Sequence, residues 1–194
     1  VADPGQKTNV AARHPKVVEE LGMAAARHRE EFMPTYFEDK RPFVIAHPGS
    51  RYTQLPARDA VAHGAIERSN RFPNCSYFRN WTSTEDRINF NAEVAAGGTY
   101  RVVLYYAAKE AGAQCELSFN NATLKFEIAE AHDVPKLGAE HDLHPRMESY
   151  VKDFKAMTIG KIVLEKGKGE LTLRATEIPG AEAMEFRLLT LERM

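Results

Sequence analysis

The hydrophobic residues change their spacing once along the chain, near Pro34. Before it, weakly polar and apolar side chains recur at intervals of three and four, at Val17, Val18, Leu21, Ala24, Ala25, His28 and Phe32. This spacing predicts one amphipathic α-helix. Pro15 suits the first helical turn because its missing N–H would be unpaired there. Pro34 is expected to end the helix, because a proline N–H cannot donate to the preceding turn.

After Pro34 the hydrophobic residues alternate with polar ones, and Gly, Pro and Asn separate the short runs. Such alternation is typical of half-buried strands. The clearest strand pair runs from Arg87 to Val94 and from Thr99 to Tyr106, and Gly97-Gly98 supplies the turn of a predicted hairpin. One face of each strand is apolar, formed by Ile88, Phe90, Ala92 and Val94 in the first and by Tyr100, Val102, Leu104 and Tyr106 in the second.

A second hairpin is predicted further along, where residues 115–119 and 124–128 alternate around an Asn120-Asn121 turn. Residues 129–157 break the pattern and are expected to cross between sheets. Strands then resume up to Leu191. About eight or nine strands without interleaved helices indicate a mainly β fold, a two-sheet antiparallel jelly-roll sandwich with one N-terminal α-helix.

The composition is that of an ordinary globular protein. The 194 residues carry a net charge of −1, with 27% charged and 43% hydrophobic residues. Lys and Arg are scattered, so no basic run predicts a nucleic-acid partner or an anionic membrane surface. No apolar stretch approaches the roughly 20 residues that a bilayer span needs. The chain starts at Val1 with no signal-peptide pattern, so we expect a fragment of a larger protein.

Two cysteines, Cys75 and Cys115, are too few for a disulfide framework. Two small buried side chains are expected, with a single disulfide as the alternative in an exported protein. Three triplets fit the N-glycosylation pattern and begin at Asn74, Asn80 and Asn121. Such triplets also arise by chance.

The first residues resemble the C-terminal end of arylsulfatase-type sulfatases. The segment Asp3-Pro4-Gly5-Gln6-Lys7-Thr8-Asn9-Val10-Ala11-Ala12 is followed by His14-Pro15-Lys16-Val17-Val18-Glu19-Glu20-Leu21, although Gln6 and Val10 replace the commoner Glu and Leu. The resemblance implies that residues 1–34 are the tail and last helix of a sulfatase catalytic region. It also implies a parent sulfuric ester hydrolase with calcium in its catalytic domain and catalytic residues upstream of Val1. Such enzymes are commonly exported, to the periplasm or outside the cell.

Residues 35–194 resemble jelly-roll domains of the carbohydrate-binding-module and galactose-binding type. The resemblance rests on three strand signatures, at residues 96–106, 160–167 and 170–174. It implies an accessory domain appended to a polysaccharide-degrading enzyme. The helix is then expected to dock partly on this sandwich, with packing in the missing sulfatase subdomain as the alternative.

Two groups of residues were tested for catalysis or metal binding. Cys75-Ser76-Tyr77-Phe78-Arg79 approaches the sulfatase Cys/Ser-x-Pro-x-Arg nucleophile motif, but Tyr77 replaces the Pro and the stretch lies in the β-rich part. We therefore expect no catalytic residue and no cofactor in this chain. His132, His141 and His144 lie among carboxylates, but their spacing matches no recognised metal site. A solvated polar loop is expected there, with a metal or catalytic site as the alternative.

The best ligand patch in the sequence surrounds Trp81, the only tryptophan, with Tyr77 and Asn80 beside it. An exposed aromatic ring can stack on a sugar while an amide binds its hydroxyl groups. The alternative is that Trp81 fills the core between two sheets.

The sequence thus predicts a non-catalytic accessory domain that binds a sulfated or neutral glycan beside an upstream sulfatase catalytic domain. The rival hypothesis is a structural module that packs on that domain or mediates oligomerisation without binding sugar. An autonomous enzyme would have to rest on residues 129–157.

Overall fold

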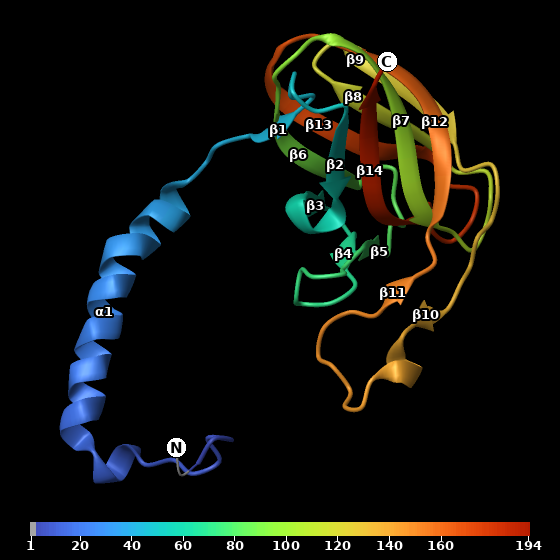
Figure 1. Ribbon diagram of the computed structural model, residues 1–194. Coiled ribbons are helices and arrows are strands. Elements are labelled where there is room, and N and C mark those ends of the chain that lie inside the picture. The colour runs from blue at the N-terminus through green and yellow to red at the C-terminus, as the bar shows by residue number, and fades with distance from the viewer. Residues whose placement is uncertain (1–2) are drawn as a thin grey trace. The chain divides into compact units, whose positions relative to one another are not determined.

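The computed structural model describes residues 3–194, apart from the side chain of Phe37. The chain forms two compact units, one ending at Arg41 and the other running from Pro42 to Met194 (Figure 1). The division falls after Arg41 and not between residues 34 and 35, because the helix of the first unit continues beyond Pro34. Partial docking of this helix on the sandwich stays a prediction.

The helix α1 spans Pro15–Glu38 and follows a short 3-10 turn at Ala11–Arg13. The prediction that Pro34 ends it was wrong. A proline inside a helix removes its own hydrogen bond and costs about 3 kcal/mol, but the flanking bonds can continue the helix. The helix ends at Glu38, and the next residue, Asp39, has an extended backbone while its N–H still donates to the Thr35 carbonyl oxygen. Among the described residues, no helix has the length and apolar character that a membrane crossing requires.

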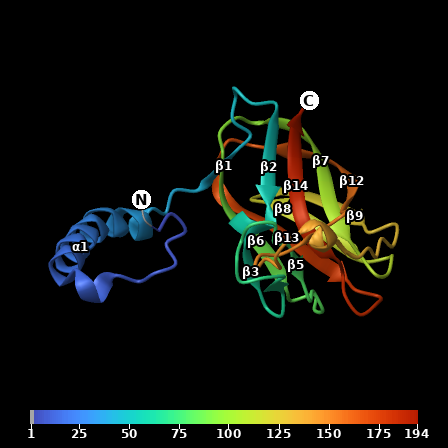
Figure 2. The same ribbon diagram turned by 60° about the horizontal axis from the view of Figure 1, so that its bottom comes forward.

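Two sheets make up the second unit (Figures 1 and 2). The first contains, in spatial order, β1 (Phe43–Ile45), β6 (Arg87–Val94), β13 (Gly167–Glu177), β8 (Gln114–Phe119) and β9 (Ala122–Glu127), with β3 (Val61–His63) also paired to β6. The second contains β12 (Lys155–Leu164), β7 (Gly98–Ala107), β14 (Glu185–Arg193), β5 (Phe78–Arg79) and β4 (Glu67–Arg68), with β2 (Tyr52–Pro56) also paired to β14. The fold is therefore the predicted mainly β, two-sheet sandwich with one N-terminal helix.

Smaller elements complete the chain. A two-stranded ladder of β10 (Lys136–Leu137) and β11 (Val151–Lys152) lies in the long connection between β9 and β12. Short 3-10 turns occur at Ala57–Asp59 and Ala139–His141. Of the strand pairs in the described residues, only β1 with β6 is parallel. Because β9 and β12 belong to different sheets, the prediction that this connection crosses between sheets is confirmed.

The strands β6 and β7 do not form the predicted hairpin. β6 pairs with β13, and β7 pairs with β12 and β14 in the opposite sheet. Each strand has one fully apolar face. These two faces can be buried either as neighbours in one sheet or facing each other across the core, and the structure has the second arrangement. The turn at Gly97 therefore carries the chain from one sheet to the other. The second predicted hairpin is confirmed, with β8 and β9 joined at Asn120-Asn121.

The core lies between the two sheets and contains both predicted apolar faces. Ile88, Phe90, Ala92 and Val94 of β6 are at most 1% exposed, as are Tyr100, Val102, Leu104 and Tyr106 of β7. Burying a side chain of this size contributes about 1.5–3 kcal/mol. The outward positions of the same strands are mostly polar, so burial fixes which face of each strand is free to meet other molecules.

Gly160 lets the edge strand β12 approach the first sheet. The register of β12 against β7 shifts between Thr158 and Gly160. A Cβ at Gly160 would lie only 2.9 Å from Cδ1 of Leu124 on β9, and the backbone φ of +136° is one that favours glycine. The bulge thus brings the end of β12 close to the β8–β9 hairpin.

We expect Gly160→Ala to lower the free energy of unfolding by about 1–3 kcal/mol, because alanine is strained at this φ. Trp81 fluorescence during urea denaturation would report the change. Gly49→Ala is the matched control, since Gly49 lies in an exposed loop and an added Cβ would meet only the exposed His47 ring, at 3.3 Å. Its effect should stay within about 0.5 kcal/mol. Equal effects of the two substitutions would contradict the role of the bulge.

Candidate functional site

The three residues of the predicted ligand patch do not share one surface. The Trp81 side chain is fully buried in the core, and Tyr77 is 2% exposed. Asn80 is exposed, and its Nδ2 donates a hydrogen bond to the Ala65 carbonyl oxygen at 2.8 Å. The backbone of Asn80 has a φ of +60°, which turns the chain after β5. No aromatic stacking surface forms at Trp81, and this arrangement favours the alternative that Trp81 fills the core.

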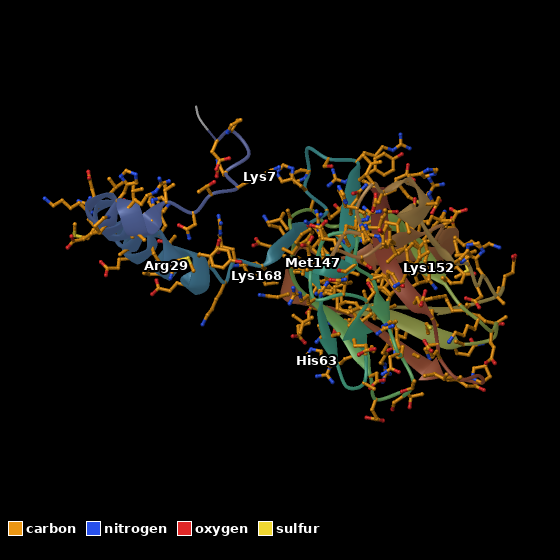
Figure 3. All side chains as sticks on the ribbon, turned by 90° about the horizontal axis from the view of Figure 1, so that it is seen from below. Lys7, Arg29, His63, Met147, Lys152 and Lys168 are labelled. Carbon is orange, nitrogen blue, oxygen red and sulfur yellow. The ribbon has the colours of Figure 1, made fainter. Side chains whose placement is uncertain are left out.

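Tyr77 is covered by the long connection between β9 and β12. The ring of Phe154 meets it edge-on with centroids 5.2 Å apart, and the Lys152 ammonium lies 5.8 Å from its centroid. Lys152 Nζ in turn lies 2.7 Å from Oε2 of Glu185, an ion pair without hydrogen-bond geometry. Burial, together with the Glu185 charge, raises the pKa of Tyr77 to about 12. Met147 and Lys152, both labelled in Figure 3, belong to this covering segment.

The histidines of the connection are not gathered into one site. His132 Nε2 lies 2.6 Å from the Asp153 carbonyl oxygen, and His141 Nε2 lies 3.6 Å from Oε1 of Glu140. Within residues 3–194, no group of three or more His, Cys, Asp or Glu side chains is arranged to hold a metal ion. This arrangement favours the interpretation of these residues as a polar loop.

Both cysteines are free thiols. Cys75 precedes β5 and is partly buried, so the Cys75 to Arg79 near-match lies in the sandwich. Cys115 lies on the inner face of β8, where burial raises the pKa of its thiol to about 12. The Cys115 environment is the opposite of that of an activated nucleophile, for which the pKa is lowered by nearby positive charge.

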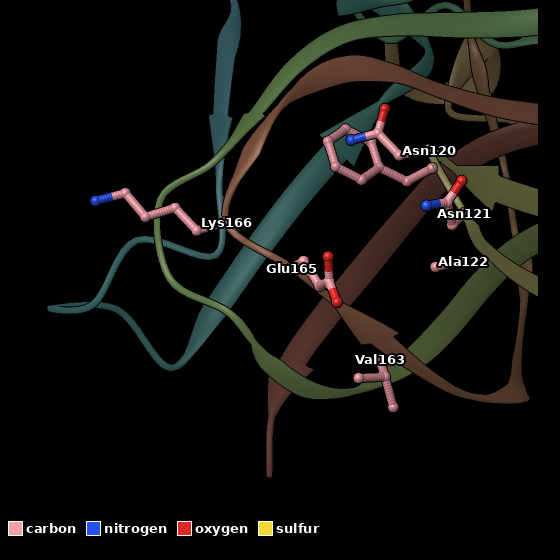
Figure 4. Close-up of a pocket in the computed structure, with 7 residues that line it drawn as sticks. Asn120, Asn121, Ala122, Val163, Glu165 and Lys166 are labelled. Atoms are coloured by element: carbon pink, nitrogen blue, oxygen red, sulfur yellow. The ribbon is translucent and has the colours of Figure 1, made fainter.

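A pocket of about 310 Å³ opens at the end of the sandwich near the C-terminus (Figure 4). Two segments that are distant in the sequence form it. The β8–β9 hairpin contributes Phe119, Asn120, Asn121 and Ala122, and the end of β12 contributes Val163, Glu165 and Lys166. Figure 4 shows both amides and the Glu165 carboxylate around the opening, while the Lys166 side chain extends away from them.

Local backbone features position these groups. Asn120 has a φ of +50°, a turn conformation that asparagine tolerates better than most residues. Gly169 on β13 leaves space for its amide, because an added Cβ there would lie 2.4 Å from Oδ1 of Asn120. The bulge at Gly160 brings the end of β12 beside this hairpin. The pocket is therefore a product of the strand arrangement and not of a flexible loop.

The polar side chains of the pocket have no protein partners. Among the described residues, none of Asn120, Asn121, Glu165 and Lys166 makes a side-chain hydrogen bond or an ion pair with another residue. The two amides and the carboxylate at the opening together offer both donors and acceptors. Val163, at 64% exposure, adds an aliphatic surface. This combination suits a small polyhydroxylated ligand, whose hydroxyl groups each donate and accept while its C–H groups need apolar contact.

No known protein family matches this sequence, and no curated protein matches it. Solved structures do match. The C-terminal CBM6 of LamC, a marine laminarinase from Zobellia galactanivorans, is similar with a TM-score of 0.53 and 5% identity over 73% of this chain and 99% of that one. The fold is that of a carbohydrate-binding-module-like jelly roll.

Two larger proteins contain a similar domain. One is the GH26-CBM35 β-(1,4)-mannanase of Podospora anserina, with a TM-score of 0.51 and 16% identity over 74% of this chain and 28% of that one. The other is the mosquito-larvicidal Cry4Aa toxin of Bacillus thuringiensis, with a TM-score of 0.54 and 12% identity over 74% and 23%. The chain thus spans about a quarter of either protein, and these identities show a shared fold alone. None of the three is a sulfatase, so sulfatase parentage stays a prediction.

The sequence contains only a weak signal for the pocket. Asn120-Asn121 is predicted as a turn, and residues 160–167 are identified only as a strand signature. Two adjacent amides at a hairpin tip could have suggested a ligand site, but their proximity to β12 depends on a crossing between sheets. Gly169 indicates the close approach of β13 to the Asn120 side chain only when the pairing of β13 with β8 is known.

The two thiols should differ in reactivity in the folded protein. At pH 8, a pKa of about 12 leaves roughly one Cys115 thiol in ten thousand as the reactive thiolate. We expect a chromogenic disulfide reagent to modify Cys75 alone in native protein and both thiols in denaturant. Cys75→Ser should abolish the native reaction. Rapid native labelling of Cys115 would contradict its burial.

Proposed function

We propose that residues 42–194 form a non-catalytic accessory module that binds carbohydrate in the pocket between the β8–β9 hairpin and the end of β12. The observation that carries the proposal is that Asn120, Asn121 and Glu165 surround this pocket and have no side-chain hydrogen bond or ion pair within residues 3–194. Their placement on a jelly roll of carbohydrate-binding-module type supports it. Catalysis would belong to another domain of the parent protein.

The chemistry of the pocket favours a saccharide over an apolar ligand. Each amide supplies two N–H donors and one acceptor oxygen, and the Glu165 carboxylate accepts. Vicinal hydroxyl groups of a sugar can satisfy both kinds of partner. The exposed surface of Val163 offers apolar contact, but the Phe119 ring is buried and cannot stack. Without an aromatic platform, we expect modest affinity, in the range of about 0.1–10 mM for a short oligosaccharide.

We further propose, from the resemblance of residues 3–21, that the parent protein is an exported sulfatase of arylsulfatase type. Its catalytic domain, with calcium, would precede Val1 and act on a sulfated glycan that this module helps to hold. The sequence upstream of Val1 tests this proposal. A Cys/Ser-x-Pro-x-Arg motif is expected there, and its absence would remove the sulfatase assignment without affecting the binding module.

A structural role is the second candidate, and the helix α1 favours it for residues 3–41. Val17, Val18, Leu21, Phe32 and Tyr36 are 48–74% exposed on this helix. An amphipathic helix is stable mainly when its apolar face is packed. This unit would then attach the module to a catalytic domain, whether or not the sandwich binds sugar.

Titration calorimetry and amide NMR of the whole chain with neutral and sulfated oligosaccharides test the binding proposal. We expect the largest shift changes at residues 119–122 and 163–166. Asn121→Ala should weaken binding about 2- to 10-fold, because it removes one or two hydrogen bonds. Glu165→Gln should weaken it by a similar or larger factor, since hydrogen bonds to a charged group are stronger.

Matched controls carry the same changes outside the pocket. Asn91→Ala and Glu177→Gln remove an exposed amide and an exposed carboxylate from strands of the first sheet. Both should bind as the unmodified chain does. Shift changes concentrated on residues 80–86 or 129–157 would move the site to the other loops. No binding at ligand concentrations well above about 10 mM, the weakest affinity expected, would leave the structural role as the better assignment.

A further inference from the structure

A row of charged and aromatic side chains crosses the outer face of the second sheet beside the pocket. Strand register pairs Lys161 of β12 with Arg101 of β7, Arg101 with Glu192 of β14, and Glu192 with Tyr52 of β2. Residues directly opposite in neighbouring strands project from the same face of a sheet. Four strands thus place these side chains in one line, which we name the Lys161–Tyr52 row.

Glu192 anchors this row. Its side chain is only 7% exposed, and the Tyr52 hydroxyl donates to its Oε1 at 2.8 Å. The Arg51 guanidinium lies 2.6 Å from Oε1, and the Arg101 guanidinium donates to Oε2. The hydrogen bond from Tyr52, with those from the two arginines, lowers the pKa of Glu192. The carboxylate therefore stays ionised and holds both guanidinium groups in place.

The row nevertheless carries more positive than negative charge. Arg51 and Arg101 pair with the single carboxylate of Glu192, and Lys161 adds a third positive charge. Each arginine side chain remains about half exposed or more, at 69% and 48%, so both side chains still present surface to solvent. Lys161 is exposed and forms no ion pair within residues 3–194. The chain as a whole has a net charge of −1, so this local excess is not a property of the entire surface.

The row also has apolar surface. Tyr52 is 54% exposed, and the Arg51 guanidinium lies over its ring at 5.4 Å from the centroid. Exposed aromatic rings of this kind pack against the C–H faces of sugars. The Lys161–Tyr52 row thus combines fixed cations with one ring.

The row is continuous with the pocket. Val163, which lines the pocket, lies two residues beyond Lys161 on the same outer face of β12 and pairs with Thr99. Three strand intervals of about 4.8 Å separate β12 from β2, so the row extends roughly 14 Å from the pocket side. That length suits several linked sugar units and exceeds what one monosaccharide would need.

We propose that the pocket and the Lys161–Tyr52 row together bind a sulfated oligosaccharide, one end of which occupies the pocket. This inference rests on the proposed carbohydrate binding. A sulfate ester has three terminal oxygens that can accept from neighbouring cations at once. A carboxylate instead presents two oxygens in a plane, which suits a single guanidinium fork. Here the cations follow one another along the row, which favours the sulfate.

Calorimetry of the whole chain with a matched series of oligosaccharides tests this inference. The series contains a neutral galactan oligosaccharide, the same oligosaccharide with sulfate esters, and a uronic acid oligosaccharide of equal length. We expect the sulfated ligand to bind at least about 10-fold more tightly than the neutral one at low salt. The difference should shrink as salt rises, because exposed charges are screened.

Substitutions separate the two parts of the surface. Arg101→Gln and Lys161→Gln should each weaken binding of the sulfated ligand about 3- to 10-fold and leave the neutral ligand unchanged. Asn121→Ala should weaken both. Lys125→Gln, on the exposed face of β9, is the charge-matched control and should change neither. Lys161 has no hydrogen-bond or ion-pair partner within residues 3–194, so its substitution remains informative even if Arg101→Gln lowers the melting temperature.

The outcomes distinguish this inference from the proposed function. Equal affinity for neutral and sulfated ligands, with dependence on Asn121, would overturn the role of the row and keep the carbohydrate site. Equal affinity for the sulfated and uronic acid ligands would overturn the sulfate assignment. Binding of the sulfated ligand that survives both row substitutions would also overturn the inference. Failure of every ligand to bind would overturn both proposals.

Discussion

Each sheet of residues 42–194 has one apolar face, and neither face can remain in water. Pressing the two faces together removes both from solvent at once and leaves the polar faces outside. Nearly every other feature depends on this burial. The turns after β6 and β12 must cross from one sheet to the other, the connection after β9 must do the same, and Trp81 is held in the core by the same requirement.

Alternation along the sequence predicted the faces of the strands well. The inward residues of β6 and β7 were identified one by one, and the hairpin at Asn120-Asn121 was placed correctly. Alternation does not show which strands are neighbours, because the apolar face of one strand can be buried against the apolar face of any other strand. For this reason β6 and β7 were paired as neighbours in the prediction, although they lie in opposite sheets.

Local sequence signals were misleading at several positions. Pro34 lies inside α1, because the loss of one hydrogen bond does not stop the bonds on either side of it. The aromatic residues Trp81 and Tyr77 looked suitable for sugar stacking, but their exposure depends on the connection and strands that cover them. The pocket was missed for a related reason. Asn121 and Glu165 lie over forty residues apart, and only the bulge at Gly160 and the crossing between sheets bring them together.

The separation between buried and outward residues also affects which positions of such a module can change during evolution. Side chains on the outer face of β12 and at the hairpin tip make few contacts with the core, so replacing them alters the surface with little effect on folding. Glu192 is different, because three neighbours converge on its carboxylate. Variation of ligand preference among related chains should therefore be widest at positions such as Lys161, Val163 and Asn121. Glu192 should be replaced only in chains in which Arg51 and Arg101 are replaced as well.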